Sequence, residues 1–416
     1  MNAEIIAIGS ELLTPFRQDT DSLYLTAKLN ELGVEVSFKT VVGDRRADLT
    51  SAAQIAFSRA DIVIFVGGLG PTEDDLTRQC VAAALGRPLA RSRQIIDDLR
   101  ARFAARGWKM SDNNLQQADI IEGAEVLPNA RGSAPGQFIH ISDSGGEAIV
   151  ILLPGPPHEL KAMFEEQVLF RLSRLTPARY IAHRELRIAM IGESAADARA
   201  AKIYKPRADV ETTILAGSPG EVQFHLRSTA ETMQQAQKNV DSLAAALEDE
   251  FEDAVFSANG ESLEQIVGYY LQMRGATLAV AESCTGGLLA ERITSIPGSS
   301  RYFLGGAVVY NNSLKTSLAD VPSPLIEQHG AVSSQVAKAL AEEIRKRCNA
   351  TLGVGITGVA GPGGGTEKKP VGLVYVSVAD ETRTEVVERN YPGDRERIRH
   401  WATQQALDLV RRRLMV

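Results

Sequence analysis

Long apolar runs, each followed by a helical pattern, constrain the fold of this sequence more than any other feature. Residues 3–9, 61–66 and 148–153 are largely apolar, which is typical of strands buried on both faces of a parallel sheet. Between the first two runs, leucines recur at helical spacing over residues 25–32. Strands that alternate with helices in this way predict a doubly wound α/β layer, which we place at residues 1–175.

The rest of the chain has two parts. The first shows a strand-like alternation of apolar and polar residues, and the second again alternates strands with helices. Within residues 176–258, Val222, Phe224 and Leu226 alternate with polar residues, which predicts a half-solvated antiparallel strand. Residues 259–416 again alternate apolar runs with helical segments. We therefore expect an α/β fold class, with two three-layer α/β domains joined by a small α+β connector.

Charge, cysteine content and hydropathy exclude several classes of protein. A formal net charge of −7 argues against sequence-independent binding to nucleic acid, which needs a basic surface. The three cysteines are widely spaced, so they fit neither a disulfide framework nor a paired-cysteine metal site. The first residues show no secretory signal, and no apolar stretch is long enough to span a bilayer. We expect a cytoplasmic protein without a membrane or nucleic-acid partner.

Three segments of the last domain place polar side chains directly after predicted strands. They are AESCTGG at 281–287, YNNSLK at 310–315 and ITGVAGP at 356–362. The carboxyl ends of parallel strands meet at one edge of a sheet, where ligands bind in open α/β folds. The first segment also opens a helix, whose free N–H groups and positive end favour a phosphate or a developing oxyanion.

In this order, and together with YPGDR at 391–395, these segments resemble the signature of the CinA family, specifically its nicotinamide-nucleotide amidase domain. The resemblance extends over residues 260–416. It implies hydrolysis of the amide of nicotinamide mononucleotide to nicotinate mononucleotide and ammonia, with no metal or other cofactor. It also implies a homodimer.

The resemblance assigns catalytic roles to four side chains. Ser283 matches the nucleophile, and Lys315 matches the lysine that activates it. Thr357 matches a hydroxyl that completes the polar network, and Tyr310 lies against the substrate. A base that takes the serine proton contributes typically ~10²–10⁴-fold to the rate. Lysine can act as that base only if burial or a nearby cation lowers its pKa.

A wider set of residues is expected to contact the substrate. Backbone N–H groups after the serine would hold the oxyanion of the tetrahedral intermediate. The N–H groups of Gly286 and Gly287 would hold the 5′-phosphate, together with Arg395 or Arg399. The full set is Thr285, Gly286, Gly287, Asn312, Gly358, Gly361, Arg395 and Arg399.

Cys284 is a rival nucleophile beside Ser283, because thiols attack more readily than alcohols. A small side chain buried in the turn is the more common interpretation of such a cysteine. The sequence indicates no histidine as its partner. We therefore assign the attack to Ser283.

A second group of candidate residues lies near the start of the chain. GGLGPTEDD at 67–75 follows a buried strand and precedes a helix, and its glycines allow a phosphate close to the backbone. Its adjacent carboxylates suit Mg²⁺, a hard cation that prefers oxygen ligands. The candidates for a phosphate or nucleotide site are Gly67, Gly68, Gly70 and Thr72.

Residues 1–170 resemble the molybdenum-cofactor-biosynthesis-like domain that precedes the amidase domain in CinA proteins. The resemblance implies hydrolysis of ADP-ribose at its pyrophosphate, with a divalent cation such as Mg²⁺ and with K⁺. The sequence departs from the family pattern at residues 14–18, where Pro15 fixes φ and removes a donor, and at Asp21, where asparagine is usual. The metal-site candidates implied by the resemblance are Glu11, Asp19, Asp74, Asp75 and Glu159.

Two other functions compete with an amidase that acts on small nucleotides. The first domain could dominate, as a molybdopterin-binding or adenylyl-transferring enzyme that the last domain regulates. Alternatively, the chain could be a non-catalytic scaffold in competence or the damage response. The acidic charge balance and the complete set of Ser283, Lys315 and Thr357 argue against a scaffold.

Overall fold

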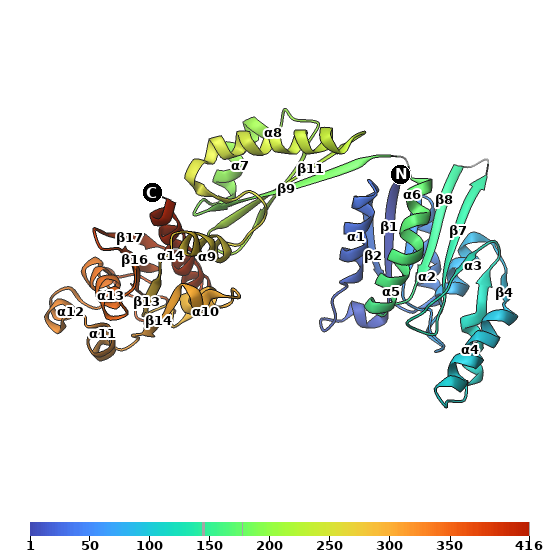
Figure 1. Cartoon of the computed structure of the whole chain (residues 1–416), viewed down its shortest axis with the longest axis horizontal. Coiled ribbons are helices and arrows are strands. Elements are labelled where there is room, and N and C mark those ends of the chain that lie inside the picture. Colours follow the sequence, from blue (N-terminus) through green and yellow to red (C-terminus); the bar gives the residue numbers. More distant parts are fainter. Residues whose placement is uncertain (144–145, 177, 416) are drawn as a thin grey trace. The chain divides into compact units, whose positions relative to one another are not determined.

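The computed structural model describes residues 1–143, 146–176 and 178–415, and the chain forms two compact units (Figure 1). The first unit comprises Met1–Ile181 with Thr229–Ala236. The second comprises Ala182–Ser228 with Gln237–Val416, so the connector strands group with the C-terminal sheet. The division into three domains at the predicted boundaries stays a prediction.

The first unit is built on a six-stranded sheet with the order β2-β1-β3-β8-β7-β6. Strands β2, β1, β3 and β8 are parallel, whereas β7 and β6 are antiparallel additions that the sequence pattern did not predict. The apolar runs form the parallel part, as predicted, because both faces of those strands are covered. The strands are β1 Asn2–Ile8, β2 Glu35–Val42, β3 Ile62–Val66, β6 Glu125–Leu127, β7 Gly136–Asp143 and β8 Gly146–Leu153.

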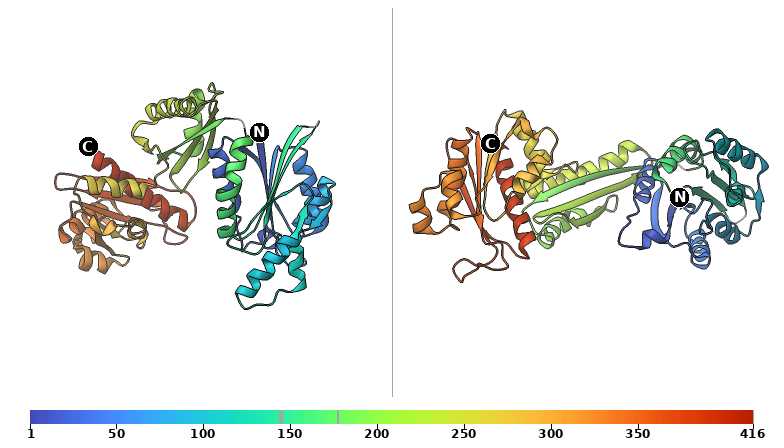
Figure 2. Two further views of the ribbon diagram at one scale, coloured as in Figure 1. Left: turned by 45° about the vertical axis from the view of Figure 1, so that its right-hand side comes forward. Right: turned by 90° about the horizontal axis from the view of Figure 1, so that it is seen from below.

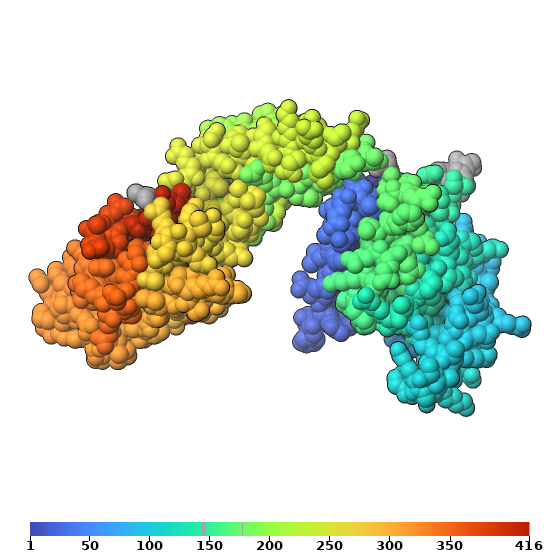
Figure 3. All heavy atoms as spheres, in the orientation of Figure 1, coloured from blue at the N-terminus to red at the C-terminus, as the bar shows by residue number. Residues whose placement is uncertain are grey.

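Helices cover both faces of this sheet, which gives three layers (Figure 2). Helices α1, α5 and α6 pack on one face, and α2 and α3 pack on the other. Helix α4 projects beyond one end of the sheet, as the ribbon and space-filling views show (Figure 1, Figure 3). The helices are α1 Asp21–Glu31, α2 Arg46–Phe57, α3 Thr77–Leu85, α4 Arg93–Ala105, α5 Pro157–Met163 and α6 Leu169–Leu175, and a short β4 Leu89–Arg91 pairs with β5 Asp119–Ile121.

The connector is a four-stranded sheet with the order β10-β11-β9-β12, and its pairs β10–β11 and β9–β12 are antiparallel. The predicted alternation is confirmed, because Val222, Phe224 and Leu226 are buried while the residues between them are half-buried. The elements are β9 Tyr180–Ala189, α7 Glu193–Tyr204, β10 Glu211–Ala216, β11 Glu221–Ala230, α8 Met233–Phe251 and β12 Val255–Ser257.

The C-terminal sheet has the order β14-β13-β15-β16-β17. Strands β14, β13 and β15 are parallel, and β16 and β17 extend the sheet in antiparallel fashion. Helices α9, α10 and α14 cover one face and α11 and α13 the other, which confirms the α/β fold class. The strands are β13 Leu278–Glu282, β14 Phe303–Val308, β15 Leu352–Gly358, β16 Leu373–Ala379 and β17 Thr384–Asn390. The helices are α9 Leu263–Met273, α10 Leu288–Thr294, α11 Asn312–Ala319, α12 Ser323–His329, α13 Ser334–Arg347 and α14 Arg395–Met415.

Helix α13 packs directly on the backbone of β15, and two glycines permit this close approach. A Cβ atom at Gly353 would lie 2.1 Å from the carbonyl oxygen of Ala341, and one at Gly355 would lie 2.4 Å from that of Ala337. Any larger residue at either position would push the helix away. The contact fixes the strand whose carboxyl end carries Thr357.

None of the helices in the described part of the chain is both long enough and apolar enough to cross a membrane. The longest helix, α14, carries a row of polar side chains that are buried inside the domain. In that row Arg411 and Asp408 form an ion pair at 2.7 Å with both side chains 2% exposed. Arg411 also donates to the backbone oxygens of Asp253 and Val255.

Removal of the carboxylate in Asp408→Ala is expected to destabilise the second unit by about 3–5 kcal/mol, because it leaves a buried guanidinium without its counter-charge. Urea unfolding followed by circular dichroism measures the change. The matched control is Glu343→Ala, which breaks the exposed pair with Lys346 and should change the stability by less than about 0.5 kcal/mol. Equal effects of the two variants would contradict the assignment of a buried, structurally required pair.

Candidate functional site

The three predicted segments of the C-terminal domain meet at the carboxyl ends of adjacent strands. Glu282, the last residue of β13, pairs with Val308 of β14 on one side and with Ile356 of β15 on the other. Ser283 directly follows β13, so the segments that carry Lys315 and Thr357 flank it. The convergence expected from parallel strand ends is therefore present.

Ser283 lies in a tight turn between β13 and α10. Its N–H donates to the carbonyl oxygen of Ile356 at 3.0 Å, and its own carbonyl accepts the N–H of Gly286 at 3.1 Å. Among the described residues, the N–H groups of Cys284 and Thr285 have no hydrogen-bond acceptor, and both residues are buried. These are the N–H groups next to the serine, and a developing oxyanion requires such donors.

Lys315 is buried, with 2% of its surface exposed, at the start of α11. Its Nζ donates to the carbonyl oxygens of Val309 at 3.0 Å and Tyr310 at 3.3 Å, and to Oδ1 of Asn312 at 3.4 Å. Burial lowers the pKa of Lys315, and the nearby thiol of Cys284 opposes the shift. A lowered pKa is the property that a lysine base requires.

Backbone hydrogen bonds connect the lysine to the serine turn. Val309, whose carbonyl holds Lys315 Nζ, donates its N–H to the carbonyl oxygen of Glu282 at 2.7 Å. Within the described residues, no hydrogen bond joins Ser283 Oγ to Lys315 Nζ. Catalytic hydrogen bonds are often long or poorly aligned without substrate and shorten when it binds.

Arg395 links its own loop to two others near the serine turn, through Tyr310 and Gly361. Arg395 donates from Nη2 to the hydroxyl of Tyr310 and from Nη1 to the carbonyl oxygen of Gly361, both at 2.7 Å. Tyr310 is 56% exposed, so its ring forms part of the outer surface. Thr357 is buried and donates to the carbonyl oxygen of Ala331 at 2.7 Å, and it makes no described bond to the serine or the lysine.

Arg399 has a different position from Arg395. Its Nε and Nη2 donate to the carbonyl oxygen of Thr285 at 3.0 and 2.6 Å, so it supports the serine turn. The Thr285 hydroxyl is fully buried and has no hydrogen-bond partner among the described residues. Of the two arginines, Arg395 lies at the exposed rim.

The structure differs from the expectation that Gly286 and Gly287 present their N–H groups to a phosphate. The Gly286 N–H closes the turn on Ser283, and the Gly287 N–H donates to Oε2 of Glu282 at 3.1 Å. This role of Glu282 was not predicted from the sequence. The signal was an acidic residue at the end of an otherwise apolar strand, directly before a glycine turn.

The environment of Cys284 disfavours it as the nucleophile. Its side chain is buried, and burial raises the pKa of its thiol to about 12, with a smaller contribution from Glu282 that also raises it. Arg395 and Lys315 act in the opposite direction on this pKa but do not overcome burial. A thiol with so high a pKa is almost entirely protonated near neutral pH and attacks slowly.

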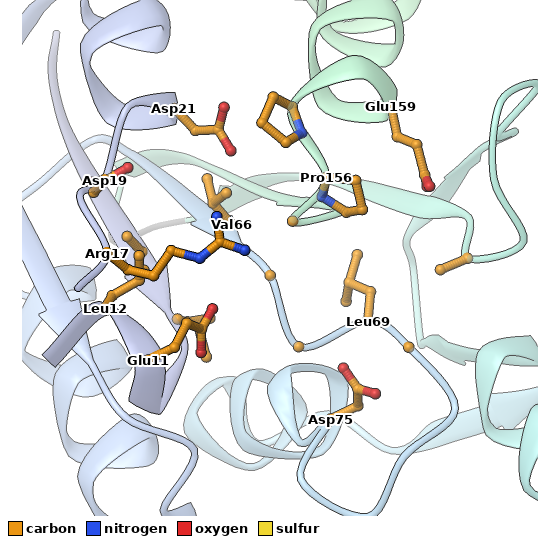
Figure 4. A pocket seen from close by; sticks show the side chains of 18 of the residues that line it. Glu11, Leu12, Arg17, Asp19, Asp21, Val66, Leu69, Asp75, Pro156 and Glu159 are labelled. Atoms are coloured by element: carbon orange, nitrogen blue, oxygen red, sulfur yellow. The ribbon is translucent and has the colours of Figure 1, made fainter. Parts of the chain in front are cut away.

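A cavity of about 610 Å³ in the first unit collects most of the N-terminal candidates. Figure 4 shows Arg17 extending into its middle, between the carboxylates of Glu11 and Asp21. Thr72 and Asp74 lie outside the lining. The predicted residues that line it are Glu11, Asp19, Gly67, Gly68, Gly70, Asp75 and Glu159.

Two basic residues of this region were not predicted. Arg17 lies in the loop that departs from the family pattern, and its guanidinium gives the cavity a cation that can pair with phosphate. Arg78 is fully buried behind the glycine loop, where Nη2 donates to the carbonyl oxygen of Leu69 at 2.8 Å. Burial lowers the pKa of Arg78 to about 10.

Four of the five metal candidates, all except Asp74, line the cavity, but they do not form a cage. Within residues 1–143, 146–176 and 178–415, no group of three His, Cys, Asp or Glu side chains is placed to hold a metal ion. Asp75 already accepts from Thr72, and Glu159 accepts from Asn129. Mg²⁺ is usually held by one or two carboxylates with phosphate oxygens and water, so the residues fit a cation that enters with a phosphorylated ligand.

Comparison with known proteins identifies the family of both domains. Residues 260–414 match the family model described as "CinA C-terminal domain", and residues 4–174 match "Probable molybdopterin binding domain". The chain is 64% identical to a CinA-like protein of Koribacter versatilis and 59% identical to one of Acidobacterium capsulatum, each over 100% of both chains. A crystal structure of competence/damage inducible protein CihA from Agrobacterium tumefaciens is 35% identical, covers 37% of this chain and 94% of its own, and has a TM-score of 0.36. The chain belongs to the CinA family.

Proposed function

We propose that this protein hydrolyses the amide of nicotinamide mononucleotide to nicotinate mononucleotide and ammonia. The observation that carries the proposal is the buried lysine of lowered pKa beside a serine turn with free N–H groups. Membership of the CinA family supports the choice of substrate. We further propose that the protein works in the cytoplasm, as its composition predicts, and that it forms a homodimer, as the family resemblance implies.

The reaction follows from the roles of the side chains. The neutral amine of Lys315 takes the proton of Ser283 as Oγ bonds to the amide carbon, and backbone N–H groups after the serine hold the resulting oxyanion. The intermediate collapses, the C–N bond breaks, and the protonated lysine returns its proton so that ammonia leaves. Water then attacks the acyl ester with Lys315 again as the base, which releases nicotinate mononucleotide and restores the serine.

The charged rim supports recognition of a nucleotide. Since Glu282 and the turn engage the N–H groups of Gly286 and Gly287, the phosphate must pair with a side chain. Both arginines already donate two hydrogen bonds, but Arg395 is the better candidate because it is exposed, whereas Arg399 is half-buried against the serine turn. Tyr310 lies beside Arg395 and offers an exposed aromatic face to the nicotinamide ring.

The cavity of the first unit supports a second activity, hydrolysis of ADP-ribose at its pyrophosphate. Its glycine loop and Arg17 suit a phosphorylated ligand, and its carboxylates suit a divalent cation brought with that ligand. When bound, such a cation would polarise a phosphoryl oxygen. The alternative ligand is a molybdopterin, and bound pterin without ammonia release from nicotinamide mononucleotide would favour it.

Replacement of the nucleophile in Ser283→Ala is expected to abolish ammonia release from nicotinamide mononucleotide, with a loss of at least about 10³-fold in kcat. A coupled ammonia assay on the full chain measures it. The matched control is Cys284→Ala, which should keep kcat within a few fold because its thiol is protonated. Wild-type turnover in Ser283→Ala, or loss in Cys284→Ala alone, would show that the serine is not the nucleophile.

The lowered pKa of Lys315 predicts the pH dependence of the amidase. Only the neutral amine accepts a proton, so kcat/KM should rise with pH through the Lys315 pKa and reach its plateau below the ordinary lysine value of 10.5. Lys315→Arg should lose most of the activity and should no longer show this rise of kcat/KM with pH, because the guanidinium stays protonated. The assignment fails if the arginine variant shows the wild-type profile.

Removal of divalent cations should separate the two activities. A chelator is expected to stop hydrolysis of ADP-ribose and to leave ammonia release from nicotinamide mononucleotide unchanged, because the serine–lysine chemistry uses no metal. Readdition of Mg²⁺ should restore the first activity. Loss of both activities with chelator would contradict independent sites.

A further inference from the structure

The N-terminus of α10 is occupied by a buried carboxylate from its own chain. Glu282 is 1% exposed and accepts the N–H groups of Gly287 at 3.1 Å, Leu289 at 3.0 Å and Ala290 at 2.8 Å. The remaining first-turn N–H, that of Leu288, donates to the carbonyl oxygen of Thr285 at 3.3 Å. The first N–H groups of the helix are therefore all satisfied within the protein.

The same residue also anchors the other side of the serine turn. The backbone oxygen of Glu282 accepts the N–H of Val309 at 2.7 Å, which ties the end of β13 to β14. Its side chain holds the first turn of α10. Ser283 and Thr285 lie between these two anchors, so one residue sets both the exit from the strand and the entry into the helix.

The charge of Glu282 determines what kind of role it can have. A carboxylate close to the serine turn would repel a developing oxyanion, so direct stabilisation of the transition state is excluded. The positive end of α10 and three N–H donors offset this charge. The remaining role is mechanical, because the carboxylate fixes the turn between β13 and α10 through three N–H groups of the helix.

We propose that Glu282 is a positioning residue for the amidase, which fixes Ser283 and its turn between β13 and α10. The inference rests on the proposed amidase function of this site. It implies that loss of the carboxylate lowers the rate of chemistry and not the affinity for substrate. Displacements of about 1 Å at reacting groups can cost about 10²-fold in rate.

The test compares kcat and KM for ammonia release by the full chain in Glu282→Gln and Glu282→Ala. We expect kcat to fall by about 10²-fold in each, with KM within about twofold of the wild type. In Glu282→Ala, added formate should restore kcat by at least about tenfold, because this small carboxylate can occupy the space beside the N–H groups of α10. Formate should not change the wild-type rate.

The matched control is Ser262→Ala, which removes the capping side chain of α9 in the same domain, away from the site. It should lower the melting temperature without a change in kcat. The inference is overturned if both Glu282 variants keep wild-type kcat, if KM rises while kcat is intact, or if formate leaves the Glu282→Ala loss in place. If Glu282→Ala does not fold, the split between kcat and KM in Glu282→Gln decides. A wild-type protein that releases no ammonia would instead defeat the proposed function.

Discussion

The end of β13 is held by backbone hydrogen bonds on both sides, and the proposed amidase site depends on them. Ser283 donates its N–H to Ile356 on β15, and the carbonyl of Glu282 accepts the N–H of Val309, which directly follows β14. The carbonyl of Val309 in turn holds Nζ of Lys315. The sheet itself, rather than a flexible loop, therefore places the nucleophile segment beside the base, as precise catalytic sites require.

Burial of Lys315 has two opposite effects: it costs folding stability, and it lowers the pKa of the amine. Desolvation of an ammonium is costly, and the three oxygens around Lys315 Nζ compensate only partly, which is why burial still lowers its pKa. A lysine on the surface would cost nothing and would remain protonated at neutral pH. In the proposed amidase, this penalty has a use, because burial keeps the amine available as a base.

The sequence predicted the parts of this protein that depend on apolar periodicity and on strand ends. The parallel strands, the alternation in β11 and the meeting of three loops follow from those patterns. The antiparallel strands β6 and β17 were missed because they are partly exposed and give no continuous apolar run. Strand β7 was missed because Gln137 and His140 interrupt its apolar residues, although its first half is buried. Gly286 and Gly287 were expected to bind phosphate, but the side chain of Glu282 folds back onto the helix and accepts the N–H of Gly287. Likewise, Arg17 lines the cavity from a loop whose path no periodicity indicates.

The central claim is that the alcohol of Ser283 carries the acyl group during turnover. Acid quench of the full chain during turnover of nicotinamide mononucleotide, followed by peptide mass spectrometry, tests this directly. The account predicts a nicotinate-mononucleotide ester on Ser283 that disappears once substrate is exhausted. An acyl group on Cys284, or steady ammonia release with no labelled peptide under conditions that trap a known acyl-enzyme, would contradict it.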